Sequence, residues 1–225
     1  MRNIGMIVAV EIEAVLKEYG EAIRVIEESG YLIHQYKLDD NNLYVIHSGA
    51  GEIAAAMTTQ FLITKFNTDL IVNFGVAGGL NGKMKLSKTC IVEKIVHYDF
   101  DTSEADNCEP CRYLDYPSVF IPTTKELVKK ATTIVPTLSS VICASGDKFI
   151  ADENKKIELN KLYNADICEM EAAGIVLTCN KNDVSCILIK TVSDAVSGGV
   201  EEFKKSFDES ARICIDITNQ IVSNI

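Results

Sequence analysis

Acidic side chains follow several apolar, strand-like stretches of this 225-residue chain. If those strands are parallel, their carboxyl ends share one edge of a sheet, and the acids meet there. Like charges gathered in one place raise the pKa of at least one carboxyl. The result is a proton-donating acid beside an ionised base, the pair that cleavage of a glycosidic bond requires. Taken singly, each of these acids is equally well explained as a helix cap or a structural carboxylate. The acids are Glu13, Asp147, Glu169, Glu171 and Asp194.

Two glycine-containing segments lie beside these acids in the predicted arrangement. Residues 75–80 (GVAGGL) follow a buried strand, where glycines let the backbone approach a ligand or simply form a tight, packed loop. Residues 49–54 (GAGEIA) fit a dinucleotide-binding fingerprint. The strand before them is the second arm of a hairpin, however, and Asp69 begins the next strand instead of ending it. We therefore favour a tight turn beside a small ligand over a dinucleotide site.

The eight cysteines are scattered, and several lie inside apolar patterns, as free thiols do in a reducing compartment. Only Cys108 and Cys111 have the spacing of a metal or redox pair. They lie in a polar stretch without a second pair of ligands, and His97 is the only histidine nearby. We favour a surface loop there, with no metal.

The periodicity of apolar residues alternates between strand and helix along the whole chain. This alternation predicts an α/β fold: a single domain over residues 1–225, with three layers (α/β/α) and a central mixed, mostly parallel, twisted sheet. Residues 101–117 form the one long irregular loop. The predicted strands are residues 4–10, 31–38, 43–48, 69–76, 90–98, 139–144, 166–168 and 184–192. The predicted helices are residues 11–28 (broken or ended near Gly20), 53–66, 123–132, 154–162, 171–180 and 201–225.

Composition excludes some partners. Thirty-two acidic residues against 22 basic ones give a formal net charge of −10, which disfavours nucleic acid and anionic membrane surfaces. No uncharged apolar stretch approaches the roughly 20 residues that span a bilayer. Glu11 and Glu13 follow the first apolar run too soon for a signal peptide, so we expect a cytoplasmic protein.

With these segments in order, the chain resembles the bacterial 5′-methylthioadenosine/S-adenosylhomocysteine nucleosidases of the nucleoside phosphorylase superfamily. The resemblance implies a nucleoside phosphorylase-like fold and hydrolysis of the N-glycosidic bond of 5′-thio-substituted adenosines, with release of adenine. It also implies a purine nucleoside as the small-molecule partner, a role in methionine salvage, no cofactor and a homodimer. The segments that carry it are residues 5–9 with Glu13, 48–51, 73–79, 98–101, 145–150, 169–171 and 193–194.

The resemblance also implies a role for each matching residue. Asp194 would be the general acid that protonates N7 of the purine, and Glu13 the general base that activates water. Glu171 would hold the ribose hydroxyls and stabilise the oxocarbenium-like transition state. Met170 would lie under the sugar and Phe149 would stack on the base. The remaining substrate-binding residues would be Ile150, through its backbone, Ser193, which would orient Asp194, and Glu169, Val76, Ala77 and Gly78.

A phosphorylase of this superfamily binds phosphate with arginines, and one of their positions is Asn73 in this chain. Arg2 lacks the family's surrounding motif, and only three other arginines exist, so water is the favoured nucleophile. The alternatives are a phosphorylase or a hydrolase acting on other purine nucleosides, and a non-catalytic purine-binding protein.

Four substitutions depart from the family pattern. Val76 replaces a serine, Lys190 an arginine, Ala50 a larger aliphatic residue, and Val200 stands where an aromatic residue is expected. They predict a wider or less aromatic pocket for the 5′ group. In the family the loop at residues 102–117 reaches the neighbouring subunit's 5′ pocket, and Tyr113 and Tyr116 would be its apolar anchors. The alternative is a surface loop with no partner.

Overall fold

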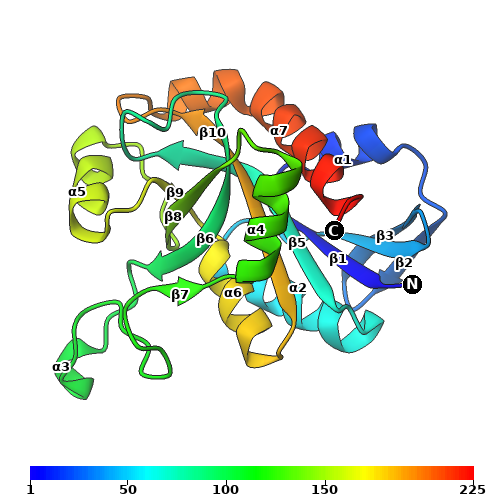
Figure 1. The fold of residues 1–225 in the computed structure, drawn as a ribbon, viewed down its shortest axis with the longest axis horizontal. Helices are drawn as coiled ribbons and strands as arrows, with labels where there is room; N and C mark the ends of the chain where they lie inside the picture. Colours follow the sequence, from blue (N-terminus) through cyan, green and yellow to red (C-terminus); the bar gives the residue numbers. More distant parts are fainter.

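The structure, a computed structural model that describes residues 1–225, is organised around one ten-stranded sheet (Figure 1). Its strands are β1 (Asn3–Val8), β2 (Arg24–Glu28), β3 (Tyr31–Leu38), β4 (Asn41–His47), β5 (Leu70–Gly79), β6 (Thr89–His97), β7 (Ile121–Pro122), β8 (Ser139–Ser145), β9 (Ile167–Glu169) and β10 (Ser185–Asp194). The helices are α1 (Ile12–Tyr19), α2 (Glu52–Phe66), α3 (Ser103–Asp106), α4 (Lys125–Ile134), α5 (Glu153–Tyr163), α6 (Ala172–Lys181) and α7 (Val200–Val222).

The strand order is β10-β6-β8-β9-β5-β1-β4-β3-β2, and β7 pairs with β6. Because β10 also pairs with β5, the five strands β5, β10, β6, β8 and β9 close into a ring. Strands β4, β1, β5 and β10 run parallel to one another, whereas the β2–β3–β4 end and the β5–β9 and β10–β6 contacts are antiparallel. The sheet is therefore mixed, as expected, and it is closed at one end.

Strand β5 explains why the chain forms three layers. Its side chains alternate between the two faces of the sheet, as strand geometry requires. Leu70, Val72 and Phe74 pack with buried residues of α1, α4 and α7, whereas Ile71 and Ala77 pack with those of α2 and α6. A third, smaller hydrophobic cluster packs Leu159 of α5 against buried residues of β6, β8 and β9. The predicted α/β/α architecture and the predicted hairpin of β3 and β4 are confirmed.

Two segments differ from the sequence-based expectation. Helix α1 ends at Tyr19, which agrees with the break or end expected near Gly20; Gly20 has a positive φ (67°) that favours glycine. Residues 24–28 instead form β2, an edge strand whose backbone pairs with β3. The long loop contains the short helix α3 and leads to β7, which the sequence pattern did not indicate.

The longest helix, α7, is amphipathic, and no helix here combines the length and apolar character needed to cross a membrane. It covers the sheet beside β10 and β5, and α5 lies at the left edge of the view, near the end of β10 (Figure 1).

Candidate active site

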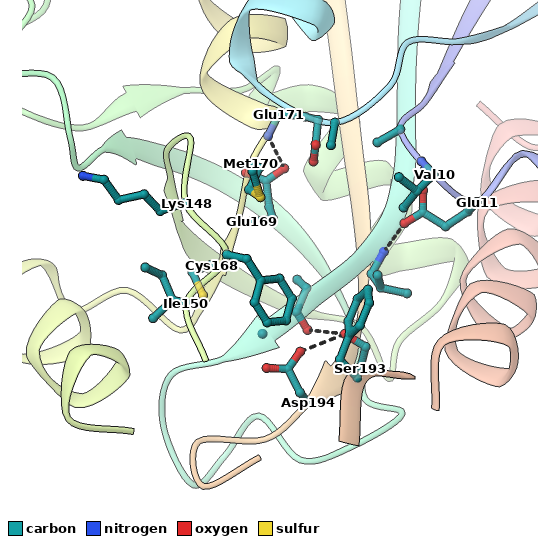
Figure 2. A pocket seen from close by; sticks show the side chains of 17 residues that line it. Val10, Glu11, Lys148, Ile150, Cys168, Glu169, Met170, Glu171, Ser193 and Asp194 are labelled. Atoms are coloured by element: carbon teal, nitrogen blue, oxygen red, sulfur yellow. Dashed lines mark hydrogen bonds between the residues drawn. The ribbon is translucent and has the colours of Figure 1, made fainter. Parts of the chain in front are cut away.

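A cavity open to solvent lies where β1, β5, β8, β9 and β10 end (Figure 2). Ligands of open α/β sheets bind at this edge. The cavity is lined by ten of the eleven residues to which sequence analysis assigns a role. They are Val76, Ala77, Gly78, Phe149, Ile150, Glu169, Met170, Glu171, Ser193 and Asp194.

Asp194 lies at the end of β10 and is 2% exposed. The Ser193 hydroxyl donates a hydrogen bond of 3.0 Å to Asp194 Oδ1, which fits the orienting role expected of Ser193 (Figure 2). Lys156 Nζ of α5 lies 2.5 Å from Asp194 Oδ2. One buried carboxylate is therefore held by a hydroxyl and an ammonium, and it borders the cavity.

The acid after the first strand that lines the cavity is Glu11. The expectation that Glu13 lies in the site is therefore wrong. Glu13 lies exposed on α1 and does not line the cavity. Strand β1 ends at Val8, two residues earlier than predicted, and the turn that follows brings Glu11 inward. Glu11 is 3% exposed; its Oε1 accepts the N–H of Val76 at 2.8 Å and its Oε2 accepts that of Val10 at 3.0 Å.

Gly75 makes the position of Glu11 possible. A Cβ atom at residue 75 would lie 2.8 Å from Glu11 Oε1, closer than a side chain tolerates. The glycine-rich end of β5 therefore admits a carboxylate of the protein itself. The sequence contains a signal for Glu11, because Glu11 is the first acidic residue after the apolar run of the first strand.

Glu171, the Ncap of α6, and Glu169, the last residue of β9, are both buried. Lys190 Nζ lies 3.0 Å from Glu169 Oε2. Burial alone would raise the pKa of Glu169, but the Lys190 ammonium and hydrogen bonds from Ser145 and Ala172 hold it below its ordinary value. Burial, and then the charge of Glu169, raise the pKa of Glu171 to about 7. Glu171 Oε1 accepts the N–H of Gly51 at 3.0 Å.

Glu52, a buried residue of α2 that sequence analysis missed, completes this group. Ser145 Oγ lies 2.5 Å from Glu52 Oε1 and 2.6 Å from Glu169 Oε1, and it accepts the N–H of Ala173. The hydroxyl has one proton and can donate to only one carboxyl, so the other carboxyl must donate to it. Burial, and then the charge of Glu169, raise the pKa of Glu52 to about 8. Glu52 is therefore the carboxyl that keeps its proton.

Asp147 caps helix α2 and is not part of the cavity wall. Its Oδ1 accepts the N–H of Glu52 at 2.8 Å. It thus satisfies a free donor at the N-terminus of α2, whose own Ncap residue is Gly51. Of the five acids singled out by the sequence pattern, three line the cavity, one caps a helix and one faces solvent.

Aromatic and aliphatic side chains form one wall of the cavity. Phe149, 45% exposed, packs edge-on against Phe203 of α7, with ring centroids 5.1 Å apart. Phe203 lines the cavity, whereas Val200 is exposed and does not. The expectation that Val200 occupies the aromatic position is therefore wrong, because α7 begins at Val200 and turns Phe203 inward. Ala50 also lines the cavity.

No arginine lines the cavity. Arg2 pairs with Asp69, Arg112 with Glu109, and Arg212 with Glu209 and Asp216. Asn73 is fully buried inside the sheet, where its amide donates to the carbonyl of Ile7 at 3.0 Å. Lys148 is the one cation that lines the cavity, and two buried lysines lie behind its wall, Lys190 on Glu169 and Lys156 on Asp194.

The long loop is partly anchored on its own chain. The Tyr113 ring stacks on Phe100 with centroids 4.1 Å apart, and its hydroxyl lies 2.8 Å from His97 Nδ1. The Tyr116 hydroxyl accepts a hydrogen bond from Asn180. Both tyrosines thus pack inward, and Leu114 between them is 65% exposed.

Cys108 and Cys111 behave differently from each other. Cys111 is 2% exposed and its Sγ lies 3.1 Å from the Tyr163 hydroxyl, whereas Cys108 is partly exposed. All eight cysteines are free thiols, and no group of histidine, cysteine and acidic side chains has the arrangement of a metal site.

Comparison with known proteins agrees with this geometry. Residues 3–223 match the profile of the phosphorylase superfamily. A 5′-methylthioadenosine/S-adenosylhomocysteine nucleosidase of Staphylococcus aureus is 30% identical over 216 residues, covering 93% of this chain and 94% of that protein. An aminodeoxyfutalosine nucleosidase of Campylobacter jejuni is 29% identical over 198 residues, covering 86% of this chain and 82% of that protein.

Solved structures have the same fold. A 5′-methylthioadenosine/S-adenosylhomocysteine nucleosidase of Campylobacter jejuni superposes with a TM-score of 0.90 at 26% identity, covering 100% of both chains. That of Helicobacter pylori with butyl-thio-DADMe-Immucillin-A gives 0.93 at 24% identity, covering 100% of this chain and 99% of the other.

Proposed function

Because this chain belongs to the phosphorylase superfamily, we propose that it is a purine nucleosidase that hydrolyses the N-glycosidic bond of 5′-thio-substituted adenosines. The observation that carries the proposal is that two buried, separately anchored carboxylates, Glu11 and Asp194, border one cavity beside an aromatic wall. One can donate a proton to a leaving base and the other can accept one from water. The names of the Staphylococcus aureus and Campylobacter jejuni relatives support the nucleosidase activity.

Asp194 is the group proposed to protonate N7 of the purine, so that the C1′–N9 bond breaks and the base leaves neutral. Glu11 is the proposed general base, the role sequence analysis assigned to Glu13. Both Glu11 oxygens already accept backbone N–H groups, at 2.8 and 3.0 Å, which favours the ionised form that a base requires. Each oxygen keeps a second lone-pair site for a water molecule, whose proton Glu11 takes as the oxygen attacks C1′.

Glu171 is proposed to bind the ribose hydroxyls and to stabilise the positive charge that develops on the sugar. Its Oε1 is fixed by the N–H of Gly51, and its other oxygen has no partner in the protein. Phe149 is proposed to stack on the purine and Met170 to lie under the sugar, since both are on the cavity wall. The Ile150 backbone would bind the edge of the base.

Hydrolysis is favoured over phosphorolysis by the charges around the cavity. A phosphate dianion needs hydrogen-bond donors such as arginine side chains. No arginine lines the cavity, and Arg2, Arg112 and Arg212 form ion pairs outside it. Lys190 is committed to Glu169, and the carboxylates of Glu11, Glu169 and Glu171 would repel the anion. Water is the nucleophile that this cavity admits most easily.

The deciding experiment measures release of free base from methylthioadenosine, adenosylhomocysteine, adenosine and inosine, with and without phosphate. We expect release of adenine from the first two substrates without phosphate. Aminodeoxyfutalosine should be tested as a further substrate, because two of the similar proteins are named aminodeoxyfutalosine nucleosidases. Strict dependence on phosphate would establish the alternative, a phosphorylase of purine nucleosides.

A homodimer and a role in methionine salvage are the finer parts of the proposal. Ile53 and Met57, one turn apart on α2, are 73% and 60% exposed. Apolar side chains exposed together favour a protein partner, and a second copy of this chain would cover them. Eight free thiols suit the reducing cytoplasm. Light scattering of the purified protein tests the dimer.

A further inference from the structure

Lys156 is completely buried although the helix that carries it, α5, is mostly polar. Its side chain crosses to the end of β10, where Nζ lies 2.5 Å from Asp194 Oδ2, 2.7 Å from the carbonyl oxygen of Ala195 and 3.3 Å from that of Gly198. Gly78 lies close to this contact, since a Cβ there would come within 3.2 Å of both Asp194 Oδ2 and Cys168 Sγ.

Hydrogen bonding fixes the protonation state of this pair. Lys156 faces three acceptors, and only the ammonium form has three N–H groups to donate. Ser193 Oγ lies 3.0 Å from Asp194 Oδ1 and 3.4 Å from the carbonyl oxygen of Ala77, and the Lys156 ammonium faces Asp194 Oδ2, so the charge beside Asp194 favours its carboxylate form. A buried charge of either sign alone is costly, and the two charges are stable here because they face each other.

This pairing leaves the acid of the proposed reaction without a proton of its own. We propose that Lys156 is a positioning residue for that step and supplies the proton that Asp194 passes to the purine; the inference rests on the proposed function. An Nζ–H bond of Lys156 breaks as an O–H bond forms on Asp194. That O–H bond breaks as the N7–H bond forms, and the C1′–N9 electron pair goes to the base.

Charge and protons balance over the cycle. Lys156 is left as a neutral amine while Glu11 holds the proton taken from the attacking water. Exchange with solvent after product release returns a proton to Lys156 and removes one from Glu11. The net reaction consumes one water molecule, as hydrolysis requires.

Other titratable groups near the pair cannot replace the ammonium. Cys168 of β9 lies beside Gly78, and burial raises the pKa of its thiol to about 12, so it stays neutral. Glu202 of α7 accepts the N–H of Ala195 at 2.6 Å and is itself an acid. Lys155, the neighbouring cation on α5, pairs with Glu158 at the surface. Within this part of the site Lys156 is the only cation that contacts Asp194.

The test is the pH dependence of kcat/KM for methylthioadenosine hydrolysis in the unaltered protein and in Lys156→Met, Lys156→Gln and Lys156→Arg. In the unaltered protein the transferable proton is on an ammonium, a group type that ordinarily loses its proton only in alkaline solution. In the Met and Gln variants a lone buried carboxyl must carry that proton, so activity is lost at lower pH. We expect the alkaline limb to move down by at least about one pH unit.

At about pH 8.5 the Met and Gln variants should lose on the order of 100-fold in kcat/KM, the usual size of general-acid assistance, and much less at about pH 5.5. Lys156→Arg keeps a cation beside Asp194. The alkaline limb of its kcat/KM profile should therefore lie closer to that of the unaltered protein. Circular dichroism and thermal melting report folding. Lys156→Gln keeps donors toward the Ala195 and Gly198 carbonyls if the Met variant does not fold.

A profile that keeps its shape in the Met or Gln variant, whether or not its height falls, would overturn the inference and leave the proposed function intact. Failure of the proposed function looks different: either no base release by the unaltered protein, or full activity in Asp194→Asn.

Discussion

At one end of the cavity a single carboxylate, Asp194, faces a single ammonium, Lys156. Beside the other end lie three buried carboxyls, Glu52, Glu169 and Glu171, with one cation, Lys190, which pairs with Glu169. The first group has balanced charge and needs no additional proton. The second has an excess of acids, so Glu52 keeps a proton and the pKa of Glu171 rises to about 7. The same residue type therefore has different protonation at the two ends, because the number of cations differs.

The largest effect is expected at the balanced end. Asp194→Asn removes the group that transfers the proton, and turnover should fall by about 10²–10⁴-fold, the usual size of general acid–base assistance. The measurement is steady-state release of adenine from methylthioadenosine. Because the change also leaves Lys156 without its counter-charge, thermal melting is needed as a control for stability. Activity near that of the unaltered protein would remove Asp194 from the mechanism.

Glu11→Gln against Glu13→Gln separates the carboxylate inside the cavity from its exposed neighbour. We expect Glu11→Gln to lower kcat by about 100-fold or more, because an amide cannot take a proton from water. Glu13→Gln should leave kcat within about twofold, since an exposed side chain away from the cavity touches no substrate. Adenine binding, seen as a thermal shift, should persist in both variants. The reverse order of effects would restore the role first predicted for Glu13.

The acid-rich end should determine activity at low pH. Only ionised Glu171 can stabilise a developing cation, and its pKa is raised to about 7. We expect kcat/KM to rise with pH up to about 7 and to fall roughly tenfold per unit below it. Glu171→Gln should lower kcat/KM across the range and abolish the titration near neutrality. An unchanged acid limb in that variant would assign the titration to another group.

The smallest effect concerns stability. The pKa of Glu52 is raised to about 8 in the folded protein, so the folded chain holds a proton that the unfolded chain releases. This contribution to stability is complete below the ordinary pKa of about 4.5 and is lost as pH rises through about 8.

Glu52→Gln imitates the protonated form, since its amide can donate to Ser145 and its carbonyl can accept from Gly174. Its free energy of unfolding should therefore fall less steeply between about pH 5 and about pH 8, where the unaltered protein loses up to about 1.4 kcal/mol per unit from this group. Urea denaturation at several pH values measures the difference. Equal slopes for the two proteins would show that Glu52 is ionised in the fold.

The sequence predicts the site residues that lie at strand ends, because apolar runs mark the strands and the fold brings the strand ends together. Asp194, Glu169 and Glu171 were found in this way. Glu13 has its expected role from the family resemblance, and local pattern does not distinguish it from Glu11; the turn after Val8 decides which of the two acids faces inward.

Lys156 and Glu52 could not be found from local pattern. Each lies on a helix beside other polar residues and is typical of a solvated face. Only tertiary packing puts α5 against the end of β10 and α2 against Ser145. Phe203 was missed because the start of α7 was aligned with Val200, one turn away.

The ring closure of the sheet divides the molecule into a part without free strand edges and a part with one. Strands β5 and β10, which carry Val76 and Asp194, are paired on both sides, whereas β2 is bonded only to β3. Hydrogen exchange should therefore be slowest in β5 and β10 and fastest in β2. The turn at Ser29 and Gly30, both with positive φ, lies in the fast-exchanging part. It is a suitable point for inserting a reporter sequence without disturbing the chemistry at the other end of the sheet.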